Sequence, residues 1–338
     1  MIVTVTPAPA IDWTITVEDF QLGAVNRVTT SHREPSGKGV NISWALHRAG
    51  IPTRAVLPAG GPTGAFMAEQ FDRAGLAHVI VDTGRDVRTN VTLITRGEST
   101  KINEPGTPLS ATQLRALGAA INEAARDATA VVICGSLPRG VPATFARDIT
   151  AALREAGVDV ILDTSGEPLE LALPARPKLI KPNISELAGL VHRPIRTFGD
   201  VVRAAHEARE RGAEAVLASL ASDGAIYVDG HVTLFAKASE VPFVNSVGAG
   251  DALLAGFLAS RSQPADRLAT ATLWAASAVA HASTRFPIRQ ALADHISVGP
   301  VPAEDRPLAE PSDTPGQPAR GVFAGSPPAF VPGGEHNV

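Results

Sequence analysis

A short run of small residues late in the chain could bind an anion. The run is Ser246-Val247-Gly248-Ala249-Gly250-Asp251, and an apolar, helix-compatible segment follows it from Ala252 to Leu258. Glycines allow the backbone close to a ligand, and the first N–H groups of a helix lack partners, so this turn favours negative charge. Asp251 has two interpretations. The helix dipole could stabilise its carboxylate by about 0.3–1 kcal/mol, or it could act as the general base for a hydroxyl that receives a phosphoryl group.

A second glycine-rich stretch, Ser36-Gly37-Lys38-Gly39-Val40-Asn41, precedes a predicted helix over residues 40–48. It is not a P-loop, because that motif needs a Ser or Thr directly after Gly-Lys, where this chain has Gly39. Taken alone, the glycines are more typical of an ordinary tight turn. The cation of Lys38 and the amide of Asn41 would, however, suit a ligand that carries a phosphate and hydroxyls.

Cations also lie on two segments that we expect to form paired strands, Arg88-Thr89-Asn90-Val91-Thr92 and Lys101-Ile102-Asn103-Glu104-Pro105-Gly106. Strand cations often face solvent and protect a sheet edge. Together with Lys38, Arg88 and Lys101 would instead form a positive patch. Such a patch in a mildly acidic protein is what the capture of a phosphorylated small molecule requires.

The stretch Lys181-Pro182-Asn183-Ile184-Ser185-Glu186 lies at a predicted strand-to-helix junction. Asn183 and Glu186 have the spacing of a capping box, so their role could be purely structural. Alternatively, Glu186 could help to hold Mg²⁺, directly or through water, near nucleotide phosphates, because Mg²⁺ takes few protein ligands. Three other loops follow apolar strands, where α/β sheets bind ligands: Gly135-Ser136-Leu137-Pro138, Asp163-Thr164-Ser165-Gly166 and Ser219-Leu220-Ala221-Ser222-Asp223-Gly224.

The elements that must position these residues alternate along the chain. Strand-like runs such as residues 2–5 and 130–134 are separated by helix-like runs such as residues 110–126. This alternation predicts a mostly parallel sheet joined by crossover helices. Segments with period-two alternation interrupt it and predict a small β lid, at about residues 11–34 (strands 12–17 and 24–31) and 86–104 (strands 89–95 and 100–103).

Composition limits the classes of function. The 338 residues carry a net charge of −4, which gives no general attraction to nucleic acid or to acidic membranes. No apolar run reaches 18 residues, and the N-terminus reads as a strand and not as a signal peptide, so we expect a cytoplasmic protein. The single cysteine, Cys134, excludes an internal disulfide. Residues 301–338 hold eight of the 27 prolines, which predicts a disordered tail after a domain over residues 1–300.

Taken together, these motifs resemble the PfkB-type, ribokinase-like sugar kinases, in the branch of 1-phosphofructokinases and tagatose-6-phosphate kinases. The resemblance covers roughly residues 1 to 290. It rests on eight motifs in order: Thr6-Pro7-Ala8-Pro9-Ala10-Ile11-Asp12, Gly37-Lys38-Gly39-Val40-Asn41, Arg88-Thr89-Asn90-Val91-Thr92, Asn103-Glu104-Pro105-Gly106, Gly135-Ser136-Leu137-Pro138, Asp163-Thr164-Ser165-Gly166, Lys181-Pro182-Asn183 and Gly248-Ala249-Gly250-Asp251.

The resemblance implies an α/β fold: a ribokinase-like three-layer αβα domain with a mostly parallel central sheet and a small β-sheet lid. It also implies transfer of a phosphoryl group from ATP to a sugar phosphate, with Mg²⁺, by a homodimer formed through the lid. Asp251 would be the base and Gly248, Ala249 and Gly250 the anion hole. The sugar phosphate would contact Asp12, Gly37, Lys38, Gly39, Asn41, Arg88, Asn90, Lys101, Asn103 and Ser136. ATP and Mg²⁺ would contact Lys181, Asn183, Glu186, Ser219, Asp223, Gly224, Ser246, Gly248 and Gly250.

The chain departs from the family pattern at His281-Ala282-Ser283-Thr284-Arg285-Phe286-Pro287, where a Gly-Thr pair is usual. The expected activity is conversion of fructose 1-phosphate to fructose 1,6-bisphosphate. The alternatives are a tagatose-6-phosphate or fructose-6-phosphate kinase and a sugar-phosphate-binding protein without catalysis. A nicotinamide-dependent oxidoreductase fits least, because Leu253 stands where the dinucleotide fingerprint needs its third Gly.

Overall fold

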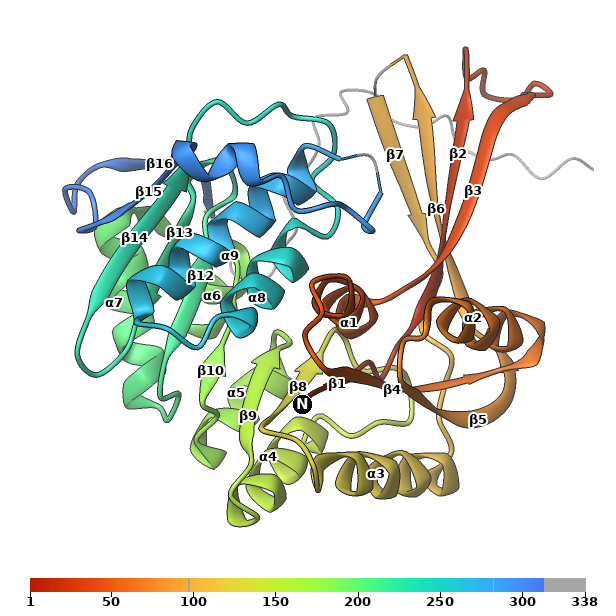
Figure 1. Ribbon diagram of the computed structural model, residues 1–338, viewed down its shortest axis with the longest axis horizontal. Helices are drawn as coiled ribbons and strands as arrows, with labels where there is room; N and C mark the ends of the chain where they lie inside the picture. The colour runs from red at the N-terminus through yellow and green to blue at the C-terminus, as the bar shows by residue number, and fades with distance from the viewer. Residues whose placement is uncertain (97, 282, 313–338) are drawn as a thin grey trace, which may run out of the picture.

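A ten-stranded sheet forms the centre of the molecule in the computed structural model, which describes residues 1–96, 98–281 and 283–312 (Figure 1). Its strand order is β15-β14-β13-β12-β10-β9-β8-β1-β4-β5. In chain order the strands are β1 (Ile2–Val5), β4 (Thr53–Gly60), β5 (His78–Asp86), β8 (Ala130–Cys134), β9 (Asp159–Asp163), β10 (Leu179–Ile180), β12 (Val216–Ser219), β13 (Ala225–Val228), β14 (Thr233–Ala238) and β15 (Ile296–Gly299).

The sheet is parallel from β5 to β12 and antiparallel from β12 to β15. Its central strands are short apolar runs, because both faces of a parallel sheet are covered by helices. β1, for example, reads Ile-Val-Thr-Val and is buried throughout. The carboxyl ends of the parallel strands therefore share one edge of the sheet, as the sequence predicted for the ligand loops.

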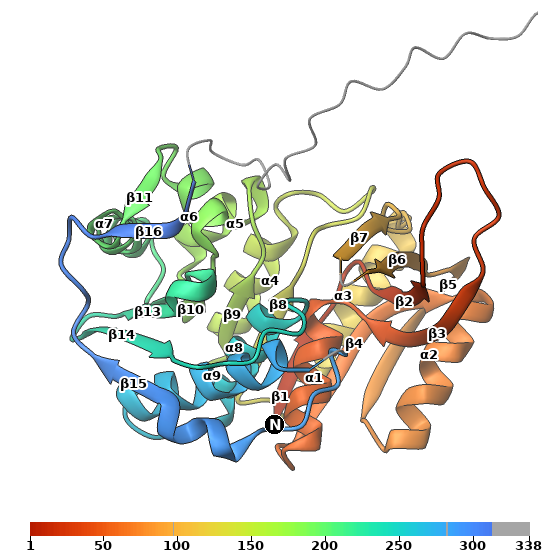
Figure 2. The ribbon, with the colours of Figure 1, turned by 90° about the horizontal axis from the view of Figure 1, so that it is seen from above.

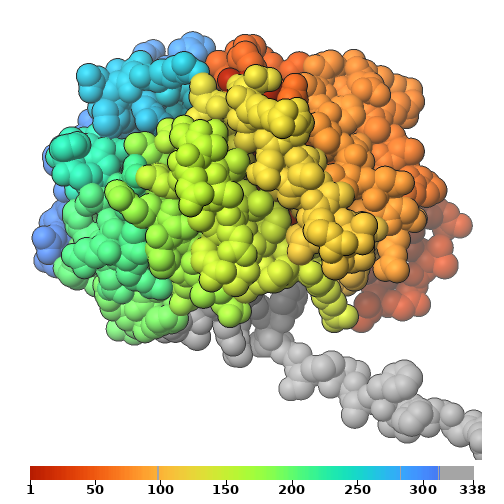
Figure 3. Space-filling view, turned by 90° about the horizontal axis from the view of Figure 1, so that it is seen from below, coloured from red at the N-terminus to blue at the C-terminus, as the bar shows by residue number. Residues whose placement is uncertain are grey.

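Helices cover both faces of the sheet, which gives the three-layer αβα architecture (Figures 1 and 2). On one face lie α1 (Lys38–Arg48), α2 (Gly61–Ala74), α8 (Ala249–Ala259) and α9 (Pro264–Val279). On the other face lie α3 (Ala111–Ala125), α4 (Phe145–Glu155), α5 (Glu167–Ala172), α6 (Ile184–Leu190) and α7 (Phe198–Glu210). Viewed from below, the yellow and green surface of α3 and α4 closes the second face (Figure 3).

The lid is a separate four-stranded sheet in the order β3-β2-β6-β7. Its strands are β2 (Ala10–Val17), β3 (Val28–Ser36), β6 (Arg88–Thr95) and β7 (Glu98–Asn103). The sheet is mixed, because β2 pairs with β6 in parallel and the outer pairs are antiparallel.

One lid strand differs from its predicted bounds. We predicted a strand over residues 24–31, but β3 runs from Val28 to Ser36 and includes Pro35. A proline reads as a strand breaker in sequence, yet an edge strand such as β3 tolerates it because one side of its backbone has no ladder partner. The longer strand carries Glu34 and Ser36 into the site described below.

The boundary predicted at residue 300 is too early. Residues 307–312 form β16 (Pro307–Ser312), which pairs antiparallel with β11 (Ile195–Thr197) and buries Leu308. A strand needs no apolar periodicity of its own when one anchoring side chain and a backbone ladder hold it, and this explains why composition alone missed it. The predicted disordered tail otherwise falls on residues 313–338, outside the described residues. Among the described residues, no helix is both long and apolar enough to cross a membrane.

Candidate active site

Three of the predicted site residues, Lys38, Lys181 and Gly248, converge with Asp163 where the central strands end and two helices begin. Asp163 is the last residue of β9, and Lys181 follows β10 directly. Lys38 is the first residue of α1, and Gly248 is the N-cap of α8. Four segments of the chain therefore bring their polar groups to one edge of the sheet.

A buried carboxylate with two lysines forms the centre of this group. Nζ of Lys38 lies 2.9 Å from Oδ1 of Asp163, and Nζ of Lys181 lies 3.4 Å from the same atom. Asp163 is fully buried, and its Oδ2 has no hydrogen-bond partner among the described residues. Burial raises the pKa of Asp163, but Lys181 and Lys38 outweigh burial and lower it. The carboxylate is therefore ionised and holds both ammonium groups.

Asp251 lies in the first turn of α8 and is only 8% exposed. Its Oδ2 accepts a hydrogen bond of 2.8 Å from Nδ2 of Asn41, which lies in α1. Burial and the nearby charge of Asp163 raise the pKa of Asp251 to about 7, against the opposing effects of Asn41, Lys38 and Lys181. A carboxylate with a pKa near neutral pH has the proton affinity that suits a general base.

The N-terminus of α8 has the geometry of an anion site. Gly248 adopts a left-handed conformation (φ 78°), and no side chain caps the helix. The N–H of Ala249 donates to the carbonyl oxygen of Ser246 at 3.3 Å, and the helix dipole favours negative charge in front of Gly250. A methyl group added to Gly250 would lie 3.4 Å from Nζ of Lys181, so a buried cation adjoins the same turn. Ser246, just before this turn, is exposed.

The lid presents a row of polar side chains toward the same region. Asp12, Asn90 and Asn103 are neighbours in register across β2, β6 and β7, so they share one face of the lid. Asp12 accepts hydrogen bonds from Ser36 Oγ (2.6 Å) and Asn90 Nδ2 (3.0 Å). Burial raises the pKa of Asp12, although both hydrogen bonds oppose the shift. Lys101 lies two residues before Asn103 on this face and is exposed.

Arg88 is partly buried at the start of β6. Its guanidinium donates to the carbonyl oxygen of Ala8 at 3.1 Å, while Nε is buried without a hydrogen-bond partner among the described residues. Ser136 is exposed in the loop after β8. Ser136 thus follows the carboxyl end of a central strand, and Arg88 lies on a lid strand, as the sequence predicted for each.

The two glycines around Lys38 allow α1 to pack closely on β1. Gly37 has φ 119°, and a methyl group there would lie 2.7 Å from Cγ2 of Thr6. A methyl group on Gly39 would overlap Oγ1 of Thr6. The glycines are therefore needed for the close packing of α1 on β1. The same packing places Lys38 and Asn41 beside Asp163 and Asp251.

Asn183 and Glu186 form the capping box of α6, as their spacing predicted. Glu186 N donates to Asn183 Oδ1 at 2.8 Å, and Asn183 N donates to Glu186 Oε2 at 2.9 Å. Oε1 of Glu186 also lies 3.5 Å from Nζ of Lys38. The described residues hold no group of three or more His, Cys, Asp or Glu that could bind a metal ion. Mg²⁺ held mainly by water and phosphates is still compatible with Glu186 Oε1 and with the unpartnered Oδ2 of Asp163.

The loop after β12 has an unexpected partner. Asp223 is buried, and its Oδ2 accepts a hydrogen bond of 2.6 Å from the backbone N–H of Ala309 in β16. Leu220 N donates to the carbonyl oxygen of Gly224 and closes the turn. Ser219 forms a bridge with Asn183. The carboxylate of Asp223 therefore has a structural role that sequence reasoning did not include.

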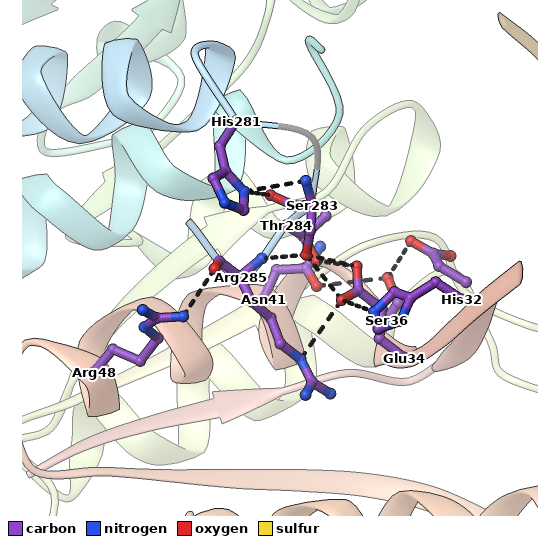
Figure 4. Close-up of polar contacts among 10 residues, drawn as sticks. His32, Glu34, Ser36, Asn41, Arg48, His281, Ser283, Thr284 and Arg285 are labelled. Carbon is purple, nitrogen blue, oxygen red and sulfur yellow. Dashed lines mark hydrogen bonds and ion pairs between the residues drawn. The ribbon is translucent and has the colours of Figure 1, made fainter. Parts of the chain in front are cut away.

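Sequence reasoning also missed a buried cluster around Glu34, shown in Figure 4. Oε1 of Glu34 accepts a hydrogen bond of 2.9 Å from Thr284 Oγ1, and Oε2 accepts one of 3.0 Å from Ser283 Oγ. Arg285 Nε lies 3.6 Å from Oε2. The only signal in the sequence was the departure from the family pattern after His281, which did not indicate a partner.

Comparison with known proteins agrees with this fold. The family model described as "pfkB family carbohydrate kinase" matches residues 2–291. The chain belongs to this family of carbohydrate kinases.

Individual relatives are more specific. A 1-phosphofructokinase of Bacillus subtilis is 35% identical over 263 residues, which cover 78% of this chain and 86% of that protein. A 1-phosphofructokinase of Haloferax volcanii is 35% identical over 85% of this chain and 93% of that protein. Among solved structures, phosphofructokinase-2 from Escherichia coli in complex with potassium has a TM-score of 0.81 and 28% identity, covering 87% of this chain and 98% of that one. A possible 1-phosphofructokinase from Thermotoga maritima has a TM-score of 0.79 and 26% identity, covering 88% and 98%.

Proposed function

We propose that the protein transfers the γ-phosphoryl group of ATP to fructose 1-phosphate and forms fructose 1,6-bisphosphate. The observation that carries this proposal is the position of Asp251, a buried carboxylate with a pKa of about 7 at the uncapped N-terminus of α8. The base and the anion site are thus adjacent, as an in-line transfer to a hydroxyl requires.

In this mechanism Asp251 accepts the proton of the free primary hydroxyl of the sugar phosphate. The hydroxyl oxygen then forms a bond to the γ-phosphorus, and the bond from that phosphorus to the β-γ bridging oxygen breaks to release ADP. Asn41 orients the carboxylate through its hydrogen bond of 2.8 Å. The N–H groups at Gly248, Ala249 and Gly250, together with Lys38 and Lys181, stabilise the negative charge on the transferred group.

The remaining site residues divide between the two substrates. The lid face with Asp12, Asn90 and Asn103 binds the sugar hydroxyls, and Arg88 and Lys101 bind the phosphate that does not react. Gly37, Gly39 and Ser136 complete this pocket. The nucleotide contacts Lys181, Asn183, Ser219, Gly224 and Ser246 on the other side, and Asp223 acts there only through the fold of its loop. Glu186 would hold Mg²⁺, partly through water, and the ion would neutralise phosphate charge.

The choice of fructose 1-phosphate is supported by the curated relatives, which are 1-phosphofructokinases at 35% identity. Several similar structures are phosphofructokinase-2 from Escherichia coli, one of them in complex with fructose-6-phosphate. A direct comparison of substrates is therefore the decisive experiment. A coupled assay for ADP formation, with ATP, Mg²⁺ and each of fructose 1-phosphate, fructose 6-phosphate and tagatose 6-phosphate, should give the highest kcat/KM with fructose 1-phosphate. A preference for another sugar phosphate would refute the substrate assignment, and binding without turnover would support a non-catalytic protein.

We further propose that the protein is cytoplasmic and forms a homodimer through the lid. Large exposed apolar side chains on β7 and in the β2–β3 connection of the lid support this arrangement, because exposed apolar surface often marks an interface. Leu22 is 94% exposed, Val25 83% and Ile102 61%.

A further inference from the structure

Glu34 connects the lid to the loop that contains Ser283 and Thr284, and this loop adjoins the anion site at Gly248. It lies near the end of β3, directly opposite Asp12 in the β2–β3 ladder. Its side chain is 7% exposed, and it accepts hydrogen bonds from the hydroxyls of Ser283 and Thr284, about 250 positions later in the sequence. A carboxylate that is buried to this degree must be hydrogen-bonded to be tolerated, so these contacts hold the two segments together.

Thr284 carries the connection to the anion site. Its hydroxyl donates to Glu34 at 2.9 Å, while its methyl group packs against Gly248. A methyl group added to Gly248 would lie 3.2 Å from Cγ2 of Thr284. Gly248 is the N-cap of α8, so Thr284 supports the turn that presents the N–H groups of the anion site.

The same loop is also attached to α1. The guanidinium of Arg285 lies 4.2 Å above the ring of Trp44, and the carbonyl oxygen of Arg285 accepts a hydrogen bond of 2.8 Å from Arg48. α1 in turn carries Asn41, which bonds Asp251. Figure 4 shows Glu34, Ser283, Thr284 and Arg285 gathered between β3 and α1. The loop thus has hydrogen bonds or stacking contacts to β3 and α1 and packs against α8.

From this arrangement we propose that Glu34 is a positioning residue, which acts through Thr284 to hold the anion site at Gly248 in register with the sugar bound by the lid. The proposal rests on the proposed kinase function, because it concerns the alignment of the two substrates. In this proposal Glu34 acts through Thr284 and not through a contact of its own with a substrate. Its loss should therefore lower the rate of phosphoryl transfer more than the affinity for the sugar phosphate, since a small misplacement of reacting groups is costly in rate.

The primary test is Thr284→Val, which removes the hydroxyl but keeps the shape and the methyl group against Gly248. We expect kcat with fructose 1-phosphate to fall by roughly tenfold to a hundredfold, with KM for the sugar phosphate nearly unchanged. The matched control is Thr272→Val in α9. Thr272 is equally buried, and its hydroxyl donates to Leu268 within the helix at 2.8 Å, away from the anion site. The control should lose thermal stability but keep kcat.

Substitutions of Glu34 give a second measurement. Glu34→Gln keeps an oxygen that can accept from Thr284, so it should retain more of kcat than Glu34→Ala does. A wild-type kcat in Thr284→Val, accompanied only by a lower melting temperature, would overturn the proposal and leave Glu34 a merely structural residue.

Failure of the proposed function would look different, because the wild-type protein would then turn over none of the sugar phosphates. In that case the thermal stabilisation of each variant by ADP replaces kcat as the readout. A smaller stabilisation of Thr284→Val than of wild type and Thr272→Val would still support the positioning role, and equal stabilisation would exclude it.

Discussion

At the scale of single residues, the environment of Asp251 differs from that of Asp163, although both carboxylates are buried in the same site. Asp163 has two lysines within 3.4 Å and keeps its charge. Burial and the nearby negative charge of Asp163 raise the pKa of Asp251, and the hydrogen bond from Asn41 opposes this shift without cancelling it. Two carboxylates whose pKa values are pushed apart can have separate roles, one to hold cations and the other to move a proton.

Asp251→Asn removes the proposed base and keeps the shape of the side chain. We expect kcat to fall by about 10²–10⁴, because this is the usual contribution of general acid–base catalysis, while KM for the sugar phosphate changes little. Steady-state kinetics with both substrates measure the two effects. A kcat close to that of wild type would refute the role of Asp251.

The pH dependence follows from the pKa of about 7 for Asp251. The base must be ionised to accept a proton, so kcat should decrease as the pH falls below 7 and level off above it. Stability changes in the opposite direction. A carboxyl whose pKa is raised by folding loses its stabilising contribution as the pH rises from about 4 to 7. Asp251→Asn should therefore melt at a higher temperature than wild type at pH 8, with a smaller difference at pH 5.

Asp163→Asn tests the coupling between the two carboxylates. The charge of Asp163 raises the pKa of Asp251, so its removal should move the acid limb of the kcat profile to lower pH. A matched control is Asp229→Asn, which alters a carboxylate bonded to backbone N–H groups in the turn between β13 and β14, remote from the site. An acid limb in the same place for wild type and Asp163→Asn would argue against this coupling.

At the scale of elements, β16 shows how a segment outside the family match is fastened to the domain. The match ends at residue 291, yet Ala309 in β16 donates its N–H to buried Asp223 in the loop after β12. This loop is one that we assign to the nucleotide side of the site. A hydrogen bond to a charged, buried acceptor contributes more than an exposed one, so this contact helps to fix the loop.

Ala309→Pro removes the donor and keeps a small side chain. We expect a loss of about 1–3 kcal/mol in the free energy of unfolding, because Asp223 is left buried without this partner. Urea denaturation measures the loss. Ala309→Val keeps the N–H group and is the control. An equal loss of unfolding free energy in both variants would mean that this hydrogen bond does not stabilise the fold.

At the scale of the whole molecule, the lid carries several of the large apolar side chains that are exposed among the described residues. Ile102 lies on β7 and points to the face opposite Lys101, because successive strand residues alternate. If the lid forms the dimer interface, Ile102→Asp should shift the protein from dimer to monomer in size-exclusion chromatography with light scattering. The control is Ile288→Asp, which places the same charge at an exposed position outside the lid and should leave the dimer intact. Leu258 is unsuitable as a control because it packs against the core. A wild-type monomer would contradict the dimer outright.

The sequence by itself predicted the fold class and most of the local structure of the site. The apolar runs of β1 and β8 were predicted with their observed bounds, because short buried strands have a strong local signal. The capping box of α6 and the glycine turn before α8 were likewise visible, since helix starts depend on residues that are close in sequence.

Contacts between distant segments were decided only by the tertiary structure. Four contacts join segments that are 86 to 250 residues apart: Asn41 with Asp251, Lys38 with Asp163, Thr284 with Glu34, and Ala309 with Asp223. The ion pair between Lys181 and Asp163 joins residues that are nearer in sequence. No local pattern specifies such a pair, because either partner alone has an ordinary explanation as a cap, a turn or an exposed charge. Burial then determines the chemistry, since the same carboxylate is a weak base in water and a base matched to neutral pH when it is desolvated beside another negative charge.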